Sequence, residues 1–144
     1  MKFTRTHLSP LVYKKEILPM NNFFQLIEES ETILFEKGVY KNGPTVVETA
    51  LSTFSEPGEA PFTVYIPINI PIEEENGFHF LDEYDIEGLS EITAFDENMM
   101  STLDKMKEEL KEQDLKLDGD RLFIVILPVF GRLFVELVLP VKED

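Results

Sequence analysis

The chain has 144 residues, enough to bury one hydrophobic core, and its apolar fraction of 43% argues against disorder. It contains no cysteine, which excludes disulfides, thiolate metal sites and cysteine nucleophiles. The net charge of −15 is concentrated in residues 42–104, where 14 acidic residues occur without a lysine or arginine, and such a field disfavours nucleic acid and membranes as partners.

The N-terminal residues contain no apolar segment of the kind that a signal peptide needs. No window approaches the roughly 18 consecutive apolar residues of a membrane helix. We therefore expect a cytoplasmic protein.

The first half of the chain has the pattern of a strand, a helix and two further strands. Residues 11–17, 45–54 and 62–72 are rich in β-branched and aromatic residues, which favour strands. Between the first two lies a predicted helix that Asn21 or Asn22 can cap and that Gly38 can end. Its apolar residues recur at helical spacing: Phe23, Leu26, Ile27, Ile33 and Leu34.

The second half repeats this order, with predicted strands at 88–95, 121–130 and 132–141. Its helix begins after Asp96, a plausible cap, and carries its own apolar stripe: Met99, Leu103, Met106 and Leu110. Methionine at such positions is typical of core filling, so we predict that both helices pack on a core.

The two halves align without a gap when one is shifted by 76 positions, which places Gly43 on Gly119 and Glu48 on Ile124. Each half ends a strand on aliphatic-Pro-aliphatic, at residues 70–72 and 139–141. A single module would leave one sheet face and one sheet edge unsatisfied. We therefore predict one α+β domain over residues 1–144, with module one at about 1–72 and module two at about 78–144. The modules would form one antiparallel sheet with a central cleft and with the helices on one side.

This order of elements, Gly43-Pro44 at the helix-to-strand turn and the aliphatic-Pro-aliphatic strand ends resemble the GyrI-like domains over nearly the whole chain. That superfamily includes the effector-binding domains of AraC-type and MerR-type bacterial transcription regulators and stand-alone gyrase inhibitors. The resemblance implies a hydrophobic cleft that binds small, often cationic molecules. Some stand-alone members hydrolyse cyclopropane-containing compounds with a glutamate and an aromatic residue. No DNA-binding segment precedes the first predicted strand, so we expect a stand-alone module.

Two acidic residues stand within apolar strands, Glu48 and Glu136, and both are candidate ligand-binding or catalytic residues. Strand alternation over residues 46–54 places Glu48 on one face with Val46, Ala50 and Phe54. A carboxylate in such surroundings suits cation binding or proton transfer. The alternative is an exposed edge residue, or one that a lysine neutralises. The aromatic residues that we expect beside these two acids are Tyr40, Phe62, Tyr65 and Phe134.

Other site chemistries find no support in the sequence. The two histidines are far apart, and no phosphate loop or hydrolase elbow occurs. Two stretches imitate a calcium loop, but Lys116 replaces one ligand of the first and Ala94 the final glutamate of the second. We therefore expect neither a metal nor a cofactor, and we interpret the region 84–91 as a solvated acidic loop.

Three functions remain open. The strand at 121–130 has no acid and the protein has no tryptophan, which favours a non-catalytic domain that binds small hydrophobic molecules, cationic ones included. The second is a hydrolase of small hydrophobic electrophiles that uses Glu48 or Glu136. The third is a protein–protein interaction or inhibitor module whose acidic face at residues 73–97 binds a basic protein partner; a merely solvated acidic surface would also explain the charge.

Overall fold

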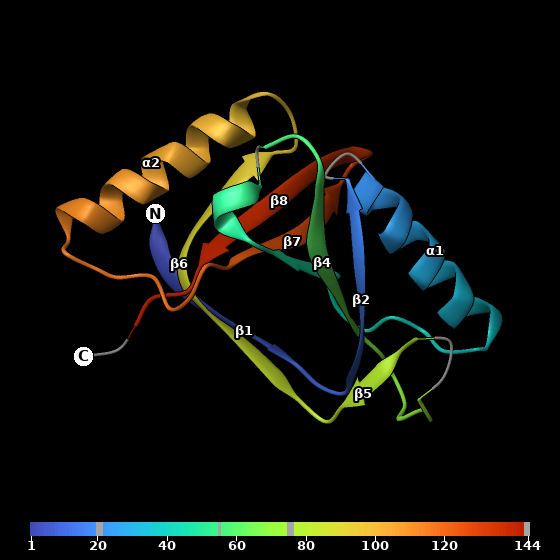
Figure 1. Cartoon of the computed structure of the whole chain (residues 1–144). Coiled ribbons are helices and arrows are strands. Elements are labelled where there is room, and N and C mark those ends of the chain that lie inside the picture. Colours follow the sequence, from blue (N-terminus) through green and yellow to red (C-terminus); the bar gives the residue numbers. More distant parts are fainter. Residues whose placement is uncertain (20–21, 55, 75–76, 143–144) are drawn as a thin grey trace.

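A computed structural model describes the chain except residues 20–21, 55, 75–76 and 143–144. It contains one antiparallel sheet with two helices (Figure 1). The helices are α1 (Phe23–Glu36) and α2 (Asn98–Glu112). The strands are β1 (Lys2–Leu8), β2 (Leu11–Pro19), β3 (Val46–Thr49), β4 (Glu59–Pro67), β5 (His79–Leu81), β6 (Tyr84–Ala94), β7 (Leu122–Val129) and β8 (Arg132–Leu139).

The strand order β1-β6-β8-β7-β3-β4-β2-β5 places β3 and β7 side by side in the middle of the sheet. On one side of this pair lie β4 and β2 of the first half, and on the other side lie β8 and β6 of the second half; each half contains one helix. The predicted α+β class and the strand–helix–strand–strand order are therefore confirmed. The outermost strands cross between the halves, because β1 pairs with β6 and β5 pairs with β2. The region 84–91 was wrongly interpreted as a loop: it belongs to β6, a paired strand.

The gap-free repeat at 76 positions holds for the helices and fails in the strands. Backbone hydrogen bonds from Asn42 to Pro67 and from Asp118 to Pro140 make these two prolines equivalent. In the first half, the segment equivalent to residues 139–141 at the end of β8 is therefore 66–68, not 70–72. Counting back through the β3–β4 and β7–β8 registers makes Val125, not Ile124, the counterpart of Glu48.

A shift of one residue matters here because alternate residues of a strand face opposite sides. Ile124 packs in the core beneath the helices, whereas Glu48 faces the other side of the sheet. Strand β3 is also shorter than predicted. It ends at Thr49, a 3₁₀ turn follows at Leu51–Thr53, and Phe54 turns into the helix-side core instead of sharing the face of Glu48.

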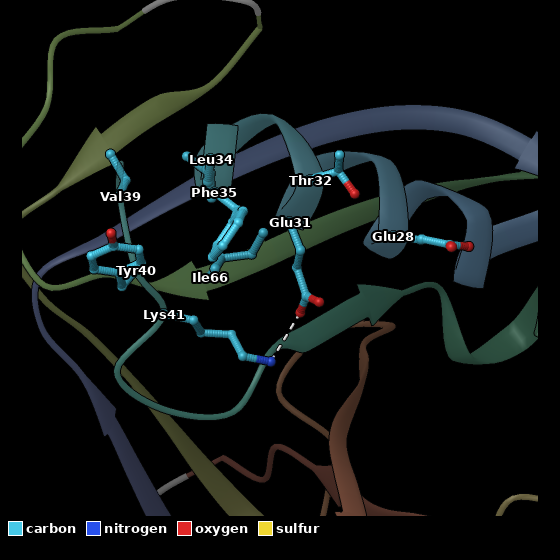
Figure 2. A pocket seen from close by; sticks show the side chains of 9 residues that line it. All are labelled: Glu28, Glu31, Thr32, Leu34, Phe35, Val39, Tyr40, Lys41 and Ile66. Carbon is cyan, nitrogen blue, oxygen red and sulfur yellow. Dashed lines mark hydrogen bonds and ion pairs between the residues drawn. The ribbon is translucent and has the colours of Figure 1, made fainter. Parts of the chain in front are cut away.

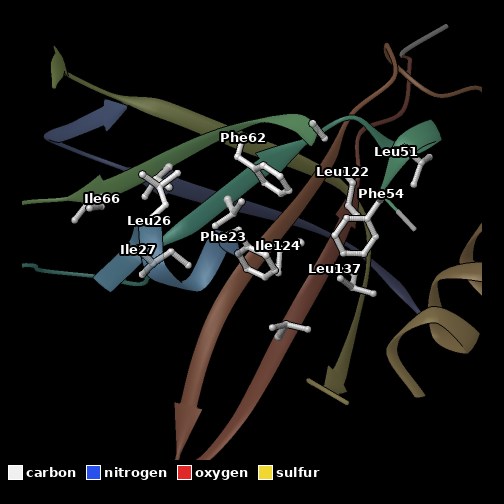
Figure 3. Packing of buried hydrophobic residues seen from close by; sticks show 14 of the residues in the cluster. Phe23, Leu26, Ile27, Leu51, Phe54, Phe62, Ile66, Leu122, Ile124 and Leu137 are labelled. Atoms are coloured by element: carbon white, nitrogen blue, oxygen red, sulfur yellow. The ribbon is translucent and has the colours of Figure 1, made fainter. Parts of the chain in front are cut away.

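The core beneath the helices confirms the predicted stripes. Phe23, Leu26, Ile27 and Leu34 of α1 are buried and Ile33 packs beside them. Figure 3 shows Phe23, Leu26 and Ile27 in this cluster. The four predicted residues of α2 are all buried. Phe23 stacks on Phe62 of β4 with ring centroids 5.8 Å apart. Neither helix has the length and apolar character needed to cross a membrane.

The helix ends follow the sequence only in part. Gly38 has the positive φ of 77° that a helix-ending glycine favours. Asp96 accepts a hydrogen bond from the Asn98 amide at 2.8 Å, as a capping residue does. Asn22 stands at the start of α1 without a side-chain capping bond, and Asn21 lies outside the described residues.

We predict that Gly88→Ala destabilises the sheet. A Cβ at Gly88 of β6 would lie 2.2 Å from the carbonyl oxygen of Leu139, so the β6–β8 pairing must shift. The free energy of unfolding, measured by urea denaturation, should fall by about 2 kcal/mol or more. Ser90→Ala is the matched control on the same strand. Its buried hydroxyl has no hydrogen-bond partner among the described residues, so its removal should be neutral or stabilising.

We predict that Phe130→Asn stabilises the protein. Phe130 and Gly131 form the two-residue loop between β7 and β8, and both have positive φ, 48° and 77°. Asparagine adopts positive φ at a lower cost than phenylalanine, and the side chain of Phe130 is fully exposed. Urea denaturation should therefore show a gain of about 0.5–1 kcal/mol in the free energy of unfolding. Phe130→Ala separates the effect of the backbone conformation from the effect of the exposed ring. It removes the ring without supplying a residue that favours this φ. An equal gain from Phe130→Ala would contradict the backbone explanation.

Candidate functional site

A second cluster of buried residues covers the sheet face opposite the helices, which we call the aromatic face. Its buried members are Leu8, Leu11, Val46, Tyr65, Ile86, Phe123, Val125 and Val138, with Tyr13, Leu81, Tyr84 and Leu127 packed against them. The rings of Tyr65 and Tyr84 stack with centroids 4.8 Å apart and an interplanar angle of 14°. Three strands separate β4 from β6 in the sheet, so this contact exists because the sheet curls.

Glu48 stands on β3 at this face and is half-buried. The hydroxyl of Tyr65 donates a hydrogen bond of 2.6 Å to its Oε1. Phe123 of β7 lies directly opposite Glu48 in the strand pairing, and the Tyr65 and Phe123 centroids are 6.4 Å apart. Within the part of the chain that the structure describes, no lysine or arginine forms an ion pair with Glu48. Its carboxylate therefore meets one hydroxyl and aromatic surface. The guanidinium of Arg121 lies over the adjacent Phe123 ring, 5.4 Å from its centroid.

The phenol of Tyr65 is held in its neutral form. Burial raises the pKa of Tyr65 most, and the hydrogen bond to the Glu48 carboxylate raises it further, because deprotonation would bring two negative charges together. Tyr65 thus remains a hydrogen-bond donor and orients the carboxylate. The arrangement can attract a cation to the second carboxylate oxygen and offer it ring faces.

Glu136 and Phe134 lie on β8 and are half-buried. Glu136 is opposite Val125 of β7 and Ile92 of β6, and it points to the same side of the sheet as Val138, a member of the aromatic face. The guanidinium of Arg132 lies over the Phe134 ring at 5.3 Å.

Phe62 and Tyr40 lie elsewhere. Phe62 is 1% exposed in the core beneath the helices, because alternation along β4 turns it away from Tyr65. Tyr40 follows α1 and is 55% exposed beside Phe35. Of the six residues predicted for the site, the structure brings Glu48 and Tyr65 into contact.

Sequence reasoning missed Phe123, Tyr84 and Tyr13. Strand alternation from the correct register would have found Phe123, since it pairs with Glu48. Tyr84 and Tyr13 reach Tyr65 only through the curl of the sheet and the β2–β4 pairing, and Tyr13 lies 6.0 Å from Tyr65 between ring centroids. No group of three or more histidine, aspartate or glutamate side chains is arranged to hold a metal among the residues that the structure describes.

Comparison with protein-family models and with curated proteins found no match. Solved structures do match. The EcmrR chain in an EcmrR–DNA complex matches 99% of this chain with a TM-score of 0.78 at 10% identity, and this chain spans 58% of it. The isolated EcmrR C-terminal domain matches with a TM-score of 0.72 at 10% identity, covering 99% of this chain and 98% of that domain.

SAV2435 bound to tetraphenylphosphonium matches with a TM-score of 0.55 at 12% identity, covering 99% of this chain and 95% of that one. The chain shares its fold with the EcmrR C-terminal domain and with SAV2435. The fold expected from the resemblance is thus confirmed over nearly the whole chain. At these identities the likeness concerns the fold, and the residues of the site have to be argued from their own geometry.

We predict that the protein loses stability as the pH rises above about 10, the ordinary pKa of tyrosine in an unfolded chain. Folding raises the pKa of Tyr65, so its contribution is fully present below that pH. Above it, unfolded Tyr65 releases a proton that folded Tyr65 retains, and the free energy of unfolding falls. Urea denaturation at a series of alkaline pH values measures this slope.

Tyr65→Phe should make the alkaline slope shallower, whereas Tyr40→Phe, at a 55% exposed position, should leave the slope attributable to Tyr65 in place. Identical slopes in the Tyr65→Phe variant and the unaltered protein would show that this phenol is not the group responsible.

Proposed function

We propose that this domain binds small hydrophobic cations at the aromatic face, with Glu48 as the counter-charge, and that it does so without catalysis. The observation that carries the proposal is the half-buried Glu48 carboxylate, which is hydrogen-bonded to Tyr65 and has no ion-pair partner among the described residues. A carboxylate so placed favours a ligand that brings its own positive charge.

The physical terms favour a bulky organic cation over a hydrated inorganic one. Aromatic faces attract a positive charge within about 6 Å of the ring centroid, and apolar groups of the ligand gain from burial against the half-buried Tyr84. A strongly hydrated ion would lose its water and find only one carboxylate in return. That SAV2435 is bound to tetraphenylphosphonium supports this class of ligand for the shared fold.

The stacked Tyr65 and Tyr84 rings define where a ligand must enter. The two rings belong to different halves of the chain and meet across the curled sheet. A bulky cation reaches Glu48 by parting these rings or by adding to the stack at its edge. Either route changes the surroundings of both tyrosines, so binding should alter tyrosine fluorescence in a protein that has no tryptophan.

We predict that the protein binds tetraphenylphosphonium and that Glu48→Gln weakens binding about tenfold or more. The substitution keeps the shape and removes the negative charge, and one lost charge contact in apolar surroundings costs at least about 1.4 kcal/mol. Isothermal titration calorimetry of the two proteins measures the difference.

Two variants sharpen this experiment. Glu108→Gln removes an exposed carboxylate from α2, remote from the aromatic face, and should leave affinity unchanged apart from a small long-range effect that added salt suppresses. Glu136→Gln tests the other candidate acid. Equal affinity of the Glu48→Gln variant and the unaltered protein for tetraphenylphosphonium would refute the proposal, and a loss confined to Glu136→Gln would move the counter-charge to β8.

A further inference from the structure

A pocket of about 490 Å³ lies on the helix side of the sheet, between α1 and the segment that follows it (Figure 2). Its floor is apolar and buried, made by Leu34, Val39 and Ile66. The volume falls within the range of about 300–1,000 Å³ that is usual for small-molecule sites. None of these residues belongs to the aromatic face.

Two aromatic side chains stand beside this floor although folding scarcely buries them. Phe35 is 69% exposed and Tyr40 is 55% exposed, and their ring centroids are 5.9 Å apart at an angle of 59°. Both line the pocket, as Figure 2 shows. These two rings expose aromatic surface beside an apolar floor. A flat apolar molecule in the pocket can therefore contact surface that is now exposed to water.

The polar side of the pocket has an organised carboxylate. Oε1 of Glu31 accepts a hydrogen bond of 2.5 Å from the hydroxyl of Thr45, which is fully buried. The same oxygen accepts a bond of 3.0 Å from Nζ of Lys41, drawn as a dashed line in Figure 2. These two donors hold the carboxylate in place. Its other oxygen, Oε2, has no hydrogen bond to any residue that the structure describes.

Glu28, one turn earlier on α1, adds a second carboxylate to the lining. No lysine or arginine pairs with Glu28 among the described residues. The lining therefore has two carboxylates and one ammonium group, which leaves one negative charge. The free acceptor on Glu31 and the carboxylate of Glu28 call for a ligand with N–H donors.

We propose that this pocket is a second binding site, for a small molecule in which a short alkyl chain joins a primary ammonium group to an aromatic ring. The ring packs on the apolar floor beside Phe35 and Tyr40, and the ammonium group donates to Glu31 and Glu28. This site differs in chemistry from the aromatic face, because tetraphenylphosphonium has no N–H to donate. It does not depend on the proposed function of Glu48, since the two sites lie on opposite sides of β3 and β4.

The test is a titration of the isotope-labelled whole chain with phenethylammonium, followed by NMR. We expect saturable shifts of the amide signals of Leu34, Val39 and Ile66. Phe35→Ala should weaken binding about three- to tenfold, by loss of a ring contact. Glu28→Gln should weaken it about two- to fivefold, by loss of an exposed charge pair. The uncharged analogue 2-phenylethanol and the anion 3-phenylpropionate should bind more weakly than phenethylammonium.

Two substitutions elsewhere serve as matched controls. Phe130→Ala removes an exposed ring from the β7–β8 loop, and Glu112→Gln removes an exposed carboxylate from α2; neither should change the affinity. Because Phe35 and Glu28 are both exposed, their variants should keep the amide spectrum of the folded protein.

Several results would overturn the proposal. These are shifts that do not saturate, equal affinity for 3-phenylpropionate, or an affinity that neither Phe35→Ala nor Glu28→Gln reduces. Loss of phenethylammonium binding in Glu48→Gln would place the ligand on the aromatic face and would also refute a second site. In that case the proposed binding of hydrophobic cations by Glu48 would still stand.

Discussion

The antiparallel pairing of β3 with β7, which sets Val46 opposite Val125, joins the two halves of this chain. The other strands extend outward from this pair, each half carrying its own helix. The register also decides which side chains face which side. It sets Glu48 opposite Phe123 on the face away from the helices. A slip by one residue would turn Glu48 into the core beneath the helices, where an unpaired carboxylate costs several kcal/mol.

The curl of the sheet then creates a contact between strands that are not paired with each other. Tyr65 and Tyr84 come from strands that are not neighbours, yet their rings stack. This contact covers Tyr65, and the covered phenol has a raised pKa and donates to Glu48. Burial, protonation and the orientation of the carboxylate thus form one chain of causes. It begins with the shape of the sheet and ends with a half-buried carboxylate that forms no ion pair among the described residues.

The two sides of β3 and β4 have different chemistries within a short stretch of chain. Tyr65 and Glu48 lie on the side of the aromatic face, while Ile66 lines the pocket beside α1. Adjacent residues of one strand lie on opposite sides of the sheet because successive side chains point in alternate directions. The lining of the pocket beside α1 has one net negative charge, which agrees with the excess of acidic residues in the chain as a whole.

The helices and the repeated order of elements could be read from the sequence because helical periodicity and β-branched runs are local signals. The buried stripe of α2, Met99, Leu103, Met106 and Leu110, follows directly from spacing. The single acid in β3 was also visible, since Glu48 stands among apolar neighbours. The sequence did not distinguish Tyr65 from Phe62 as the aromatic neighbour of that acid, because both are aromatic residues of the same strand. They differ in the face of β4 on which each side chain lies.

The sequence by itself therefore determined the class of the fold, the number of modules and the residues that the helices bury. The tertiary structure decided the strand register, the early end of β3 at Thr49 and the meeting of Tyr65 with Tyr84. The physical reason is range. Helical faces depend on residues three or four apart, whereas register and curl depend on strands distant in sequence. A register shift of one residue is too small to alter an apolar pattern, but it moves every side chain of the strand to the opposite face of the sheet.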